Sequence, residues 1–262
     1  MTPGPLLFAR YAFPPNSLGY CGPADARALR EYGSAGVTDR GLTELARGFA
    51  GAWPYLELIA AANGIADPLD ARVVEAYWVG SALLDGVGIP DLGASADERF
   101  RRLAGRGWDR VAGAVLAGAV PHHSFHVFCV YPWTGLLRSG RTEPSLQVLD
   151  RCRISWGQVL AAPAEGSVLV LQRPLTWDGR RLALGAPQPR IVSTGFLASP
   201  PPGTPPPGTP RPGPPGSPRP GDWVSLHWDT ACDILRTTQI LALRAYTARH
   251  LRLINCDTHY FW

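Results

Sequence analysis

The chain has 262 residues, of which 45% are hydrophobic, and it carries a formal net charge of +4. This length can hold one large domain or two modest ones, each with its own core. All 25 of its cations are arginines, and they are scattered along the chain instead of gathered among aromatic residues, so the charge does not indicate a nucleic-acid partner. No apolar run approaches the roughly 20 residues that span a bilayer, and the first residues lack the pattern of a secretory signal. We therefore expect a cytoplasmic protein that binds neither nucleic acid nor a membrane.

The cysteines favour the same compartment. There are five of them at irregular spacing: Cys21, Cys129, Cys152, Cys232 and Cys256. An odd number without a regular pattern does not indicate a disulfide framework, and no Cys-x-x-Cys pair suggests a zinc site. A reducing cytoplasm follows, in which at least one of these thiols can be kept for chemistry.

Residues 1–120 are predicted to be mostly helical. An irregular lead that carries Pro14 and Pro15 comes first. Capping residues and prolines then predict helices at about 24–32, 41–50, 54–63 and 69–84, and two more that begin near 95 and 108. The segment 69–84 is apolar nearly all round, so we expect it at the centre of the helical part.

After Pro121 the hydrophobic period changes to that of strands. Alternating segments rich in β-formers predict strands at 125–131, 146–149, 154–160, 167–172 and 180–184. Residues 199–221 contain proline at 12 of 23 positions, which predicts an extended surface loop inserted between strands.

The stretch 221–229 alternates in the manner of a half-buried strand. Val224 and Leu226 fall on the core face, and His227 falls on the opposite face, where we expect it to be exposed. Asp229 and Thr230 then indicate the start of a helix over about 230–254. That helix has two apolar faces, so it is expected to lie between the β-rich part and the helical part.

These elements predict an α+β protein. An N-terminal helical domain, residues 1–120, precedes a small OB-like β-barrel with a C-terminal packing helix, residues 121–262. The proline-rich segment 199–221 is an inserted loop of this second domain.

Two short motifs mark the ends of the β-rich module. It begins with Cys152, followed by Gly-Gln-Val at 157–159, and it closes with Gly-Asp-Trp-Val at 221–224 and then His227. In content and order, this module resembles the HypC/HupF family of [NiFe]-hydrogenase maturation chaperones. In that family the cysteine is N-terminal and is followed by a proline, whereas Cys152 is internal and Trp156 occupies the proline position.

The resemblance implies a metal site made by Cys152 and His227. The cargo would be iron that carries cyanide and carbon monoxide, and the partners would be the hydrogenase large-subunit precursor or other maturation proteins. Thiolate and imidazole suit such an iron, and two protein ligands leave positions for diatomic molecules and for a partner. The leading hypothesis is thus an accessory protein, not an enzyme, with Cys152 and His227 close together at one rim of the barrel.

A second constellation indicates a different class of protein. Cys21 comes shortly before a predicted helix, whose dipole would lower the thiol pKa; histidines follow at 122–126, and Asp150 follows the next predicted strand. This order is typical of papain- and transglutaminase-like enzymes, in which a thiolate attacks, an imidazole acts as base and a carboxylate orients it. The alternative is therefore a cysteine hydrolase or acyltransferase that uses Cys21, His123 or His126, and Asp150. A protein with a purely structural, interacting role is a third possibility.

Overall fold

A computed structural model describes residues 2–198 and 217–256. Its helices are Gly4–Ser17 (α1), Ala26–Ala35 (α2), Arg40–Arg47 (α3), Trp53–Ala62 (α4), Ala71–Trp78 (α5), Ile89–Ala104 (α6), Trp108–Leu116 (α7), His123–Phe125 (α8), Trp133–Arg138 (α9), Thr142–Cys152 (α10) and Thr237–Asn255 (α11). Its strands are Ser155–Ala164 (β1), Ser167–Gln172 (β2), Leu175–Trp177 (β3), Leu182–Leu184 (β4), Gln188–Ser193 (β5), Trp223–His227 (β6) and Thr230–Ile234 (β7). Short 3₁₀ segments occupy Ala82–Gly86, Gly105–Gly107 and Gly195–Ala198, and a π-helix (η3) occupies His126–Val130. The chain is α+β, as predicted.

Five strands close into a small barrel in the order β1-β2-β5-β7-β6. Strand β6 runs antiparallel to the first strand, β1, with Gly157 opposite Val224, and this pairing closes the barrel. Alternate residues of the strands point inward and form a hydrophobic cluster of their own: Val159, Val168, Val170, Val192, Val224 and Leu226. The predicted barrel, with a helical region before it and a helix after it, is therefore confirmed.

The irregular lead expected at the N-terminus is wrong, because residues 4–17 form α1. Phe8 and Tyr11 are fully buried on this helix, and their burial favours the ordered helix. Pro14 and Pro15 lie in its last turn. Each lacks the backbone N–H that would bond to a carbonyl one turn earlier, and the helix ends within a few residues of them. The prolines mark the end of a helix and not the absence of one.

The single helix expected over 69–84 is broken into α5 and a 3₁₀ turn. The break lies at Gly80, whose φ of 106° is open to glycine and strained for other residues. The ring of Tyr246, on α11, packs against Gly80 at the position where a side chain would stand. Close contact with α11 therefore explains the interruption.

The strands expected at 125–131 and 146–149 are wrong, because the chain stays helical through Cys152 and the first strand begins at Ser155. The residues of the first segment are buried all round, and an apolar run of that length does not distinguish a strand from a buried helical turn. The change from helices to strands therefore comes later than residue 121. One hydrophobic cluster crosses the predicted boundary, since it contains Val73 of α5, Trp156 of β1 and Leu243 of α11.

The helix expected over 230–254 begins only at Thr237, because Thr230–Ile234 forms β7. Trp228 and Asp229 both have positive φ, of 48° and 60°, and make the tight turn between β6 and β7. Such turns usually carry asparagine and glycine, so this one has no turn signal in its sequence.

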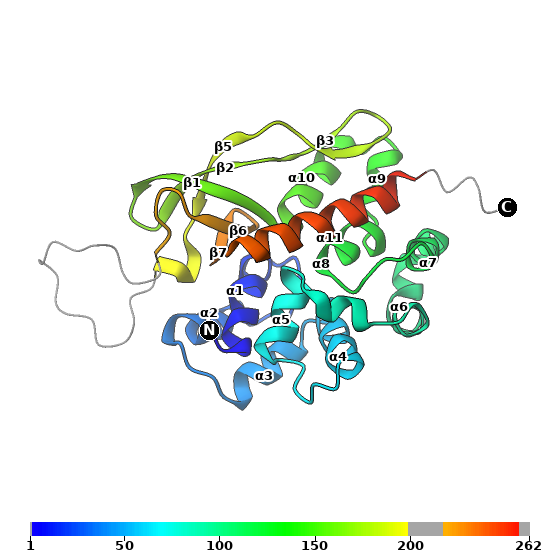
Figure 1. Ribbon diagram of the computed structural model, residues 1–262, viewed down its shortest axis with the longest axis horizontal. Helices are drawn as coiled ribbons and strands as arrows, with labels where there is room; N and C mark the ends of the chain where they lie inside the picture. Colours follow the sequence, from blue (N-terminus) through cyan, green and yellow to red (C-terminus); the bar gives the residue numbers. More distant parts are fainter. Residues whose placement is uncertain (1, 199–216, 257–262) are drawn as a thin grey trace, which may run out of the picture.

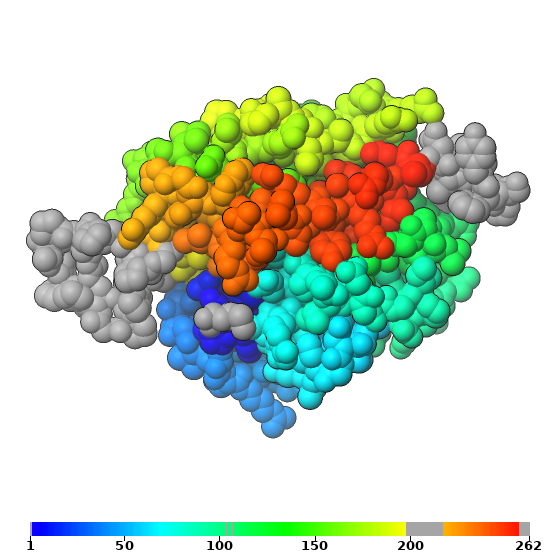
Figure 2. Space-filling model, viewed as in Figure 1, coloured from blue at the N-terminus to red at the C-terminus, as the bar shows by residue number. Residues whose placement is uncertain are grey.

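The last helix, α11, joins the two parts of the molecule. It contacts α8 and η3 on the helical side and β4 on the strand side. Figure 1 shows it crossing the middle of the molecule, with β1, β2 and β5 above it and α4–α6 below it. In Figure 2 it is the orange-to-red band between the yellow-green and cyan surfaces.

The proline-rich loop predicted at 199–221 lies largely outside the described residues, which resume at 217. Within the described part of the chain, no helix has the length and apolar character needed to cross a membrane.

Candidate metal centre

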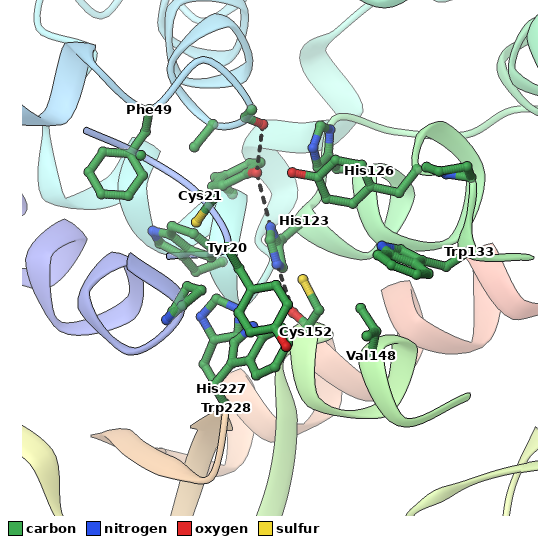
Figure 3. A pocket seen from close by; sticks show the side chains of 18 residues that line it. Tyr20, Cys21, Phe49, His123, His126, Trp133, Val148, Cys152, His227 and Trp228 are labelled. Atoms are coloured by element: carbon green, nitrogen blue, oxygen red, sulfur yellow. Dashed lines mark hydrogen bonds between the residues drawn. The ribbon is translucent and has the colours of Figure 1, made fainter. Parts of the chain in front are cut away.

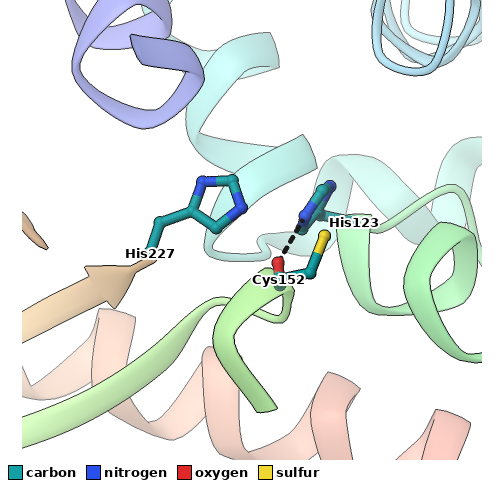
Figure 4. A group of neighbouring side chains, drawn as sticks. All are labelled: His123, Cys152 and His227. Carbon is teal, nitrogen blue, oxygen red and sulfur yellow. Dashed lines mark hydrogen bonds between the residues drawn. The ribbon is translucent and has the colours of Figure 1, made fainter. Parts of the chain in front are cut away.

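Three side chains with metal-binding atoms meet between the barrel and the helices. His123, Cys152 and His227 each offer one ligand atom, and these atoms lie within 4.8 Å of one another. Figure 4 shows the imidazole of His227 turned toward the ring of His123, with the Cys152 sulfur beside that ring. The structure brings Cys152 and His227 together, as the sequence predicts, and it adds His123 from a different element.

His227 is the last residue of β6. Its side chain points away from the barrel interior, as the alternation predicts, but its expected exposure is wrong because only 1% of the residue is accessible. Helix α1 covers this outer face, and the Nδ1–H of His227 donates to the Tyr11 carbonyl at 2.6 Å. With the proton on Nδ1, Nε2 carries a free lone pair, and this buried atom has no hydrogen-bond partner among the described residues.

His123 lies in the single turn α8 and is held at both ring nitrogens. Its Nε2 is 2.9 Å from the Cys152 carbonyl, so it donates there, while its Nδ1 is 3.0 Å from the Tyr77 hydroxyl. The single proton of that hydroxyl is donated either to this Nδ1 or to the Gly51 carbonyl, which lies 3.2 Å away. If the ring proton moves to Nδ1, it can donate to Tyr77, but the lone pair of Nε2 then faces the Cys152 carbonyl oxygen, so a metal binds Nε2 only after the ring or this carbonyl turns away. Such a partner on the far nitrogen is the usual support of a metal-binding imidazole.

Cys152 ends α10, three residues before β1 begins. Burial raises the pKa of its thiol to about 12, so the group is a neutral thiol at pH 7. The next residue, Arg153, is 1% exposed and holds this corner by bonding the Asp150 carboxylate at 2.9 Å and the Arg173 carbonyl at 2.6 Å. These bonds of Arg153 hold the backbone next to Cys152 at the end of α10.

The electrostatics of the cluster favour neutral ligands. Burial lowers the pKa of His227 to about 4, and burial together with the neighbouring His227 and His126 lowers the pKa of His123 well below its ordinary value. Both imidazoles are thus uncharged at pH 7, which is the protonation state that binds metal ions.

The cluster borders a cavity of about 260 Å³ (Figure 3). Phenylalanine, tyrosine and tryptophan supply seven of the 18 described residues that line it, and none of the 18 is an aspartate, glutamate, lysine or arginine. Tyr20 and Trp228 stack at 4.0 Å between ring centroids and form one wall. Polar contacts inside are therefore made by the histidines, the two cysteines and the tyrosine hydroxyls, in surroundings of low polarity.

The residues of the alternative enzyme are only partly assembled. Cys21, His123 and His126 line the same cavity, but Asp150 is not among its lining residues and instead pairs with Arg153. The expectation of a lowered thiol pKa is wrong: α2 begins at Ala26, five residues after Cys21, and burial raises the pKa of Cys21 to about 12. The structure therefore brings together a cysteine and histidines without the orienting carboxylate.

The supporting residues of the site carry weak signals in the sequence. Tyr11 offers a backbone carbonyl and Tyr77 a hydroxyl, and both lie in helices whose apolar patterns describe core residues equally well. His123 was noticeable as part of the run at 122–126, but its approach to Cys152 depends on the tertiary packing of α8 against α10.

Comparison with known proteins gives one match. A family model described as a family of unknown function (DUF6390) matches residues 1–260. The chain belongs to this family. The DUF6390 match runs through both the helical part and the barrel, so it includes all three residues of the cluster. No curated protein and no solved structure match the chain.

Proposed function

We propose that this protein binds one transition-metal ion through His123, Cys152 and His227 and acts as a metal-carrying accessory protein. The observation that supports this most directly is the meeting of the three ligand atoms within 4.8 Å, although they come from α8, α10 and β6. One thiolate with two imidazoles is a donor set that suits zinc, copper, iron and nickel, and it is unsuited to calcium or magnesium.

The buried polar atoms fit such an ion. His227 Nε2 has no partner among the described residues, and an unpaired buried polar atom is costly unless something else satisfies it. The hydrogen bonds between His227 and the Tyr11 carbonyl and between His123 and the Tyr77 hydroxyl hold the two rings. Metal-binding imidazoles commonly have such hydrogen-bond partners on the nitrogen that does not bind the metal. A cation here would exchange with the thiol proton of Cys152.

The charge of a bound divalent ion would favour a further ligand from outside the protein. A divalent ion and one thiolate leave a net charge of about +1 in a cavity whose described lining has no carboxylate. An exogenous anion or a ligand from a partner protein would neutralise this charge. Three protein ligands leave coordination positions for either.

The specific form of the proposal comes from the resemblance of the barrel to HypC/HupF proteins. Cys152 and His227 stand at the positions that the resemblance assigns to iron, and the cargo would be an iron that carries cyanide and carbon monoxide. The partner would be the [NiFe]-hydrogenase large-subunit precursor or another maturation protein. In this protein the helical part would add His123 as a further ligand.

Anaerobic purification tests the proposal. The wild-type chain, Cys152→Ser and Cys256→Ser would be purified from cells that make a [NiFe]-hydrogenase, and then measured by elemental analysis and infrared spectroscopy. Cys256 is exposed and does not line the described cavity, so its variant is a matched control. We expect about one metal ion per chain in the wild type and the control, and little in Cys152→Ser.

The infrared spectrum separates the general proposal from its specific form. Bands of bound cyanide and carbon monoxide, lost in Cys152→Ser, would support the iron carrier. Bound metal without those bands would support the metal centre but contradict a role in carrying iron for hydrogenase maturation. Wild-type protein without bound metal, even after incubation with ferrous, zinc or cobalt ions, would overturn the proposal.

A further inference from the structure

A second cavity adjoins the one beside the metal cluster. It has a volume of about 470 Å³ and shares part of its lining with the inner cavity of about 260 Å³. The residues that line both are Tyr20, Cys21, Gly22, Gly51, His126 and Tyr131. The two cavities therefore meet at a common wall, and the inner one ends at the His-Cys-His cluster.

The outer cavity is cationic. Arg47 and Arg99 line it, no described aspartate or glutamate does, and their side chains are 54% and 45% exposed. Arg47 contacts Glu44 at 3.1 Å, and Arg99 contacts Glu98 at 3.9 Å and Glu57 at 4.0 Å, but these carboxylates are not part of the lining. A cavity with two half-exposed guanidinium groups on its own surface attracts small anions.

The common wall presents a hydrogen-bond donor. The Tyr55 hydroxyl is 3.2 Å from His126 Nδ1, and donation by Tyr55 satisfies its own proton and leaves the His126 proton on Nε2. His126 is 2% exposed, and this Nε2 has no partner among the described residues. An unpaired N–H at the junction of two cavities is suited to an acceptor that passes or rests there.

A glycine, Gly51, packs closely against the common wall. A Cβ at Gly51 would lie 2.9 Å from His126 Nε2 and 3.5 Å from the Tyr131 hydroxyl. The backbone of Gly51 does not have a positive φ, so the absence of a side chain is not required by its conformation. A methyl group at Gly51 would therefore crowd the His126 ring and approach the Tyr131 hydroxyl.

We propose that the two cavities form an entry route through which a small inorganic anion reaches the metal ion at His123, Cys152 and His227. This inference rests on the proposed metal centre. Arg47 and Arg99 attract the anion, and the wall at Gly51 and His126 passes it to the inner cavity. There it supplies the negative charge that the lining lacks.

Azide binding to the cobalt(II)-loaded protein tests the route. Azide is a small linear anion, and its coordination changes the visible absorption of cobalt, so its association rate can be measured by stopped flow. In the double variant Arg47→Gln/Arg99→Gln we expect association to slow about tenfold, with a loss of the decrease that salt causes in the wild type. The matched control, Arg30→Gln/Arg102→Gln, removes two exposed arginines that do not line the cavities, and it should keep the wild-type rate.

The variant Gly51→Ala tests the junction. In the cobalt-loaded protein its methyl group should slow azide association and dissociation by a similar factor, about fivefold or more, and so change the azide Kd little. Gly113→Ala is the control, because a Cβ there would meet nothing within 4 Å.

The outcomes separate this inference from the proposed function. Wild-type protein that binds no cobalt overturns the metal centre, and the route with it. Cobalt-loaded protein that does not respond to azide overturns the route alone. So does an azide association rate that is the same in the double arginine variant, in Gly51→Ala and in their controls.

Discussion

His227, at the end of barrel strand β6, donates its Nδ1–H to the carbonyl of Tyr11 on the first helix, at 2.6 Å. This bond joins the two ends of the chain and selects the tautomer that leaves Nε2 free beside Cys152 and His123. The orientation of this candidate metal ligand in the barrel is therefore set by the helical part. The isolated barrel would lack both this bond and His123.

Metal binding should release one proton per ion at neutral pH. The pKa of Cys152 is raised to about 12 and that of His227 is lowered to about 4, so between these values only the thiol has a proton to lose. Affinity should therefore rise about tenfold for each pH unit from 6 to 8. Zinc titrations at three pH values, with proton release measured in two buffers, check this. A pH-independent affinity would show that Cys152 is not a ligand.

Acid should destabilise the metal-free protein. The pKa of each buried histidine is lower in the folded state, to about 4 for His227 and about 3 for His126, because burial disfavours the charged ring. Below pH 6.5 the unfolded chain then binds more protons, so stability is fully present above about pH 6.5 and falls as pH drops toward 4. Each histidine contributes a slope of about 1.4 kcal/mol per pH unit in this window.

Urea denaturation at pH 7, 6 and 5, in the presence of a chelator, measures this dependence. In the variant His227→Gln, the free energy of unfolding should fall less steeply with decreasing pH, by about 1.4 kcal/mol per pH unit, the contribution of one histidine. Equal stability at pH 7 and pH 5 would contradict the account of buried neutral histidines.

Tyr77→Phe should weaken metal binding without removing a ligand. The Tyr77 hydroxyl lies 3.0 Å from His123 Nδ1, and loss of such a partner commonly reduces metal affinity about tenfold. Tyr55→Phe is the matched control, because it removes the same group from the Nδ1 of His126, which is not part of the cluster. Competition with a chromophoric chelator measures both. Equal affinities for the two variants would mean that Tyr77 does not support the site.

The sequence predicts the barrel better than the helices beside the site. The alternation around Val224 and Leu226 identifies β6, because one face of that strand fills the barrel interior. It also gives the direction of His227, but not its burial, since the covering helix α1 comes from the other end of the chain. Burial by distant segments has no local signal.

The same limit applies to His123 and to the turn at Trp228. The run after Pro121 is buried on all sides, so its β-formers indicate a strand where tertiary contacts enforce a helical turn. Trp228 and Asp229 adopt positive φ without asparagine or glycine, so the local sequence predicted a helix start instead. The sequence predicts Cys152 as a candidate ligand, whereas the position of His123 beside it depends on the packing of α8.

Cys21 should react slowly with iodoacetamide. Burial raises the pKa of Cys21 to about 12, so roughly one thiol in 10⁵ is ionised at pH 7. Cys256 is exposed and should be labelled first. Peptide mass mapping of the folded protein after short exposure checks the order. Preferential labelling of Cys21 would revive the hydrolase or acyltransferase alternative.

A cobalt(II) titration followed by absorption spectroscopy tests the central claim most directly, because cobalt bound to a thiolate gives an intense near-ultraviolet band. We predict one equivalent of cobalt with this band in the wild type and in Cys256→Ser. The band should be lost in Cys152→Ser, and binding should be at least about tenfold weaker in His123→Gln and His227→Gln. Wild-type protein without the band, or Cys152→Ser with the same band, would contradict a metal centre at these three residues.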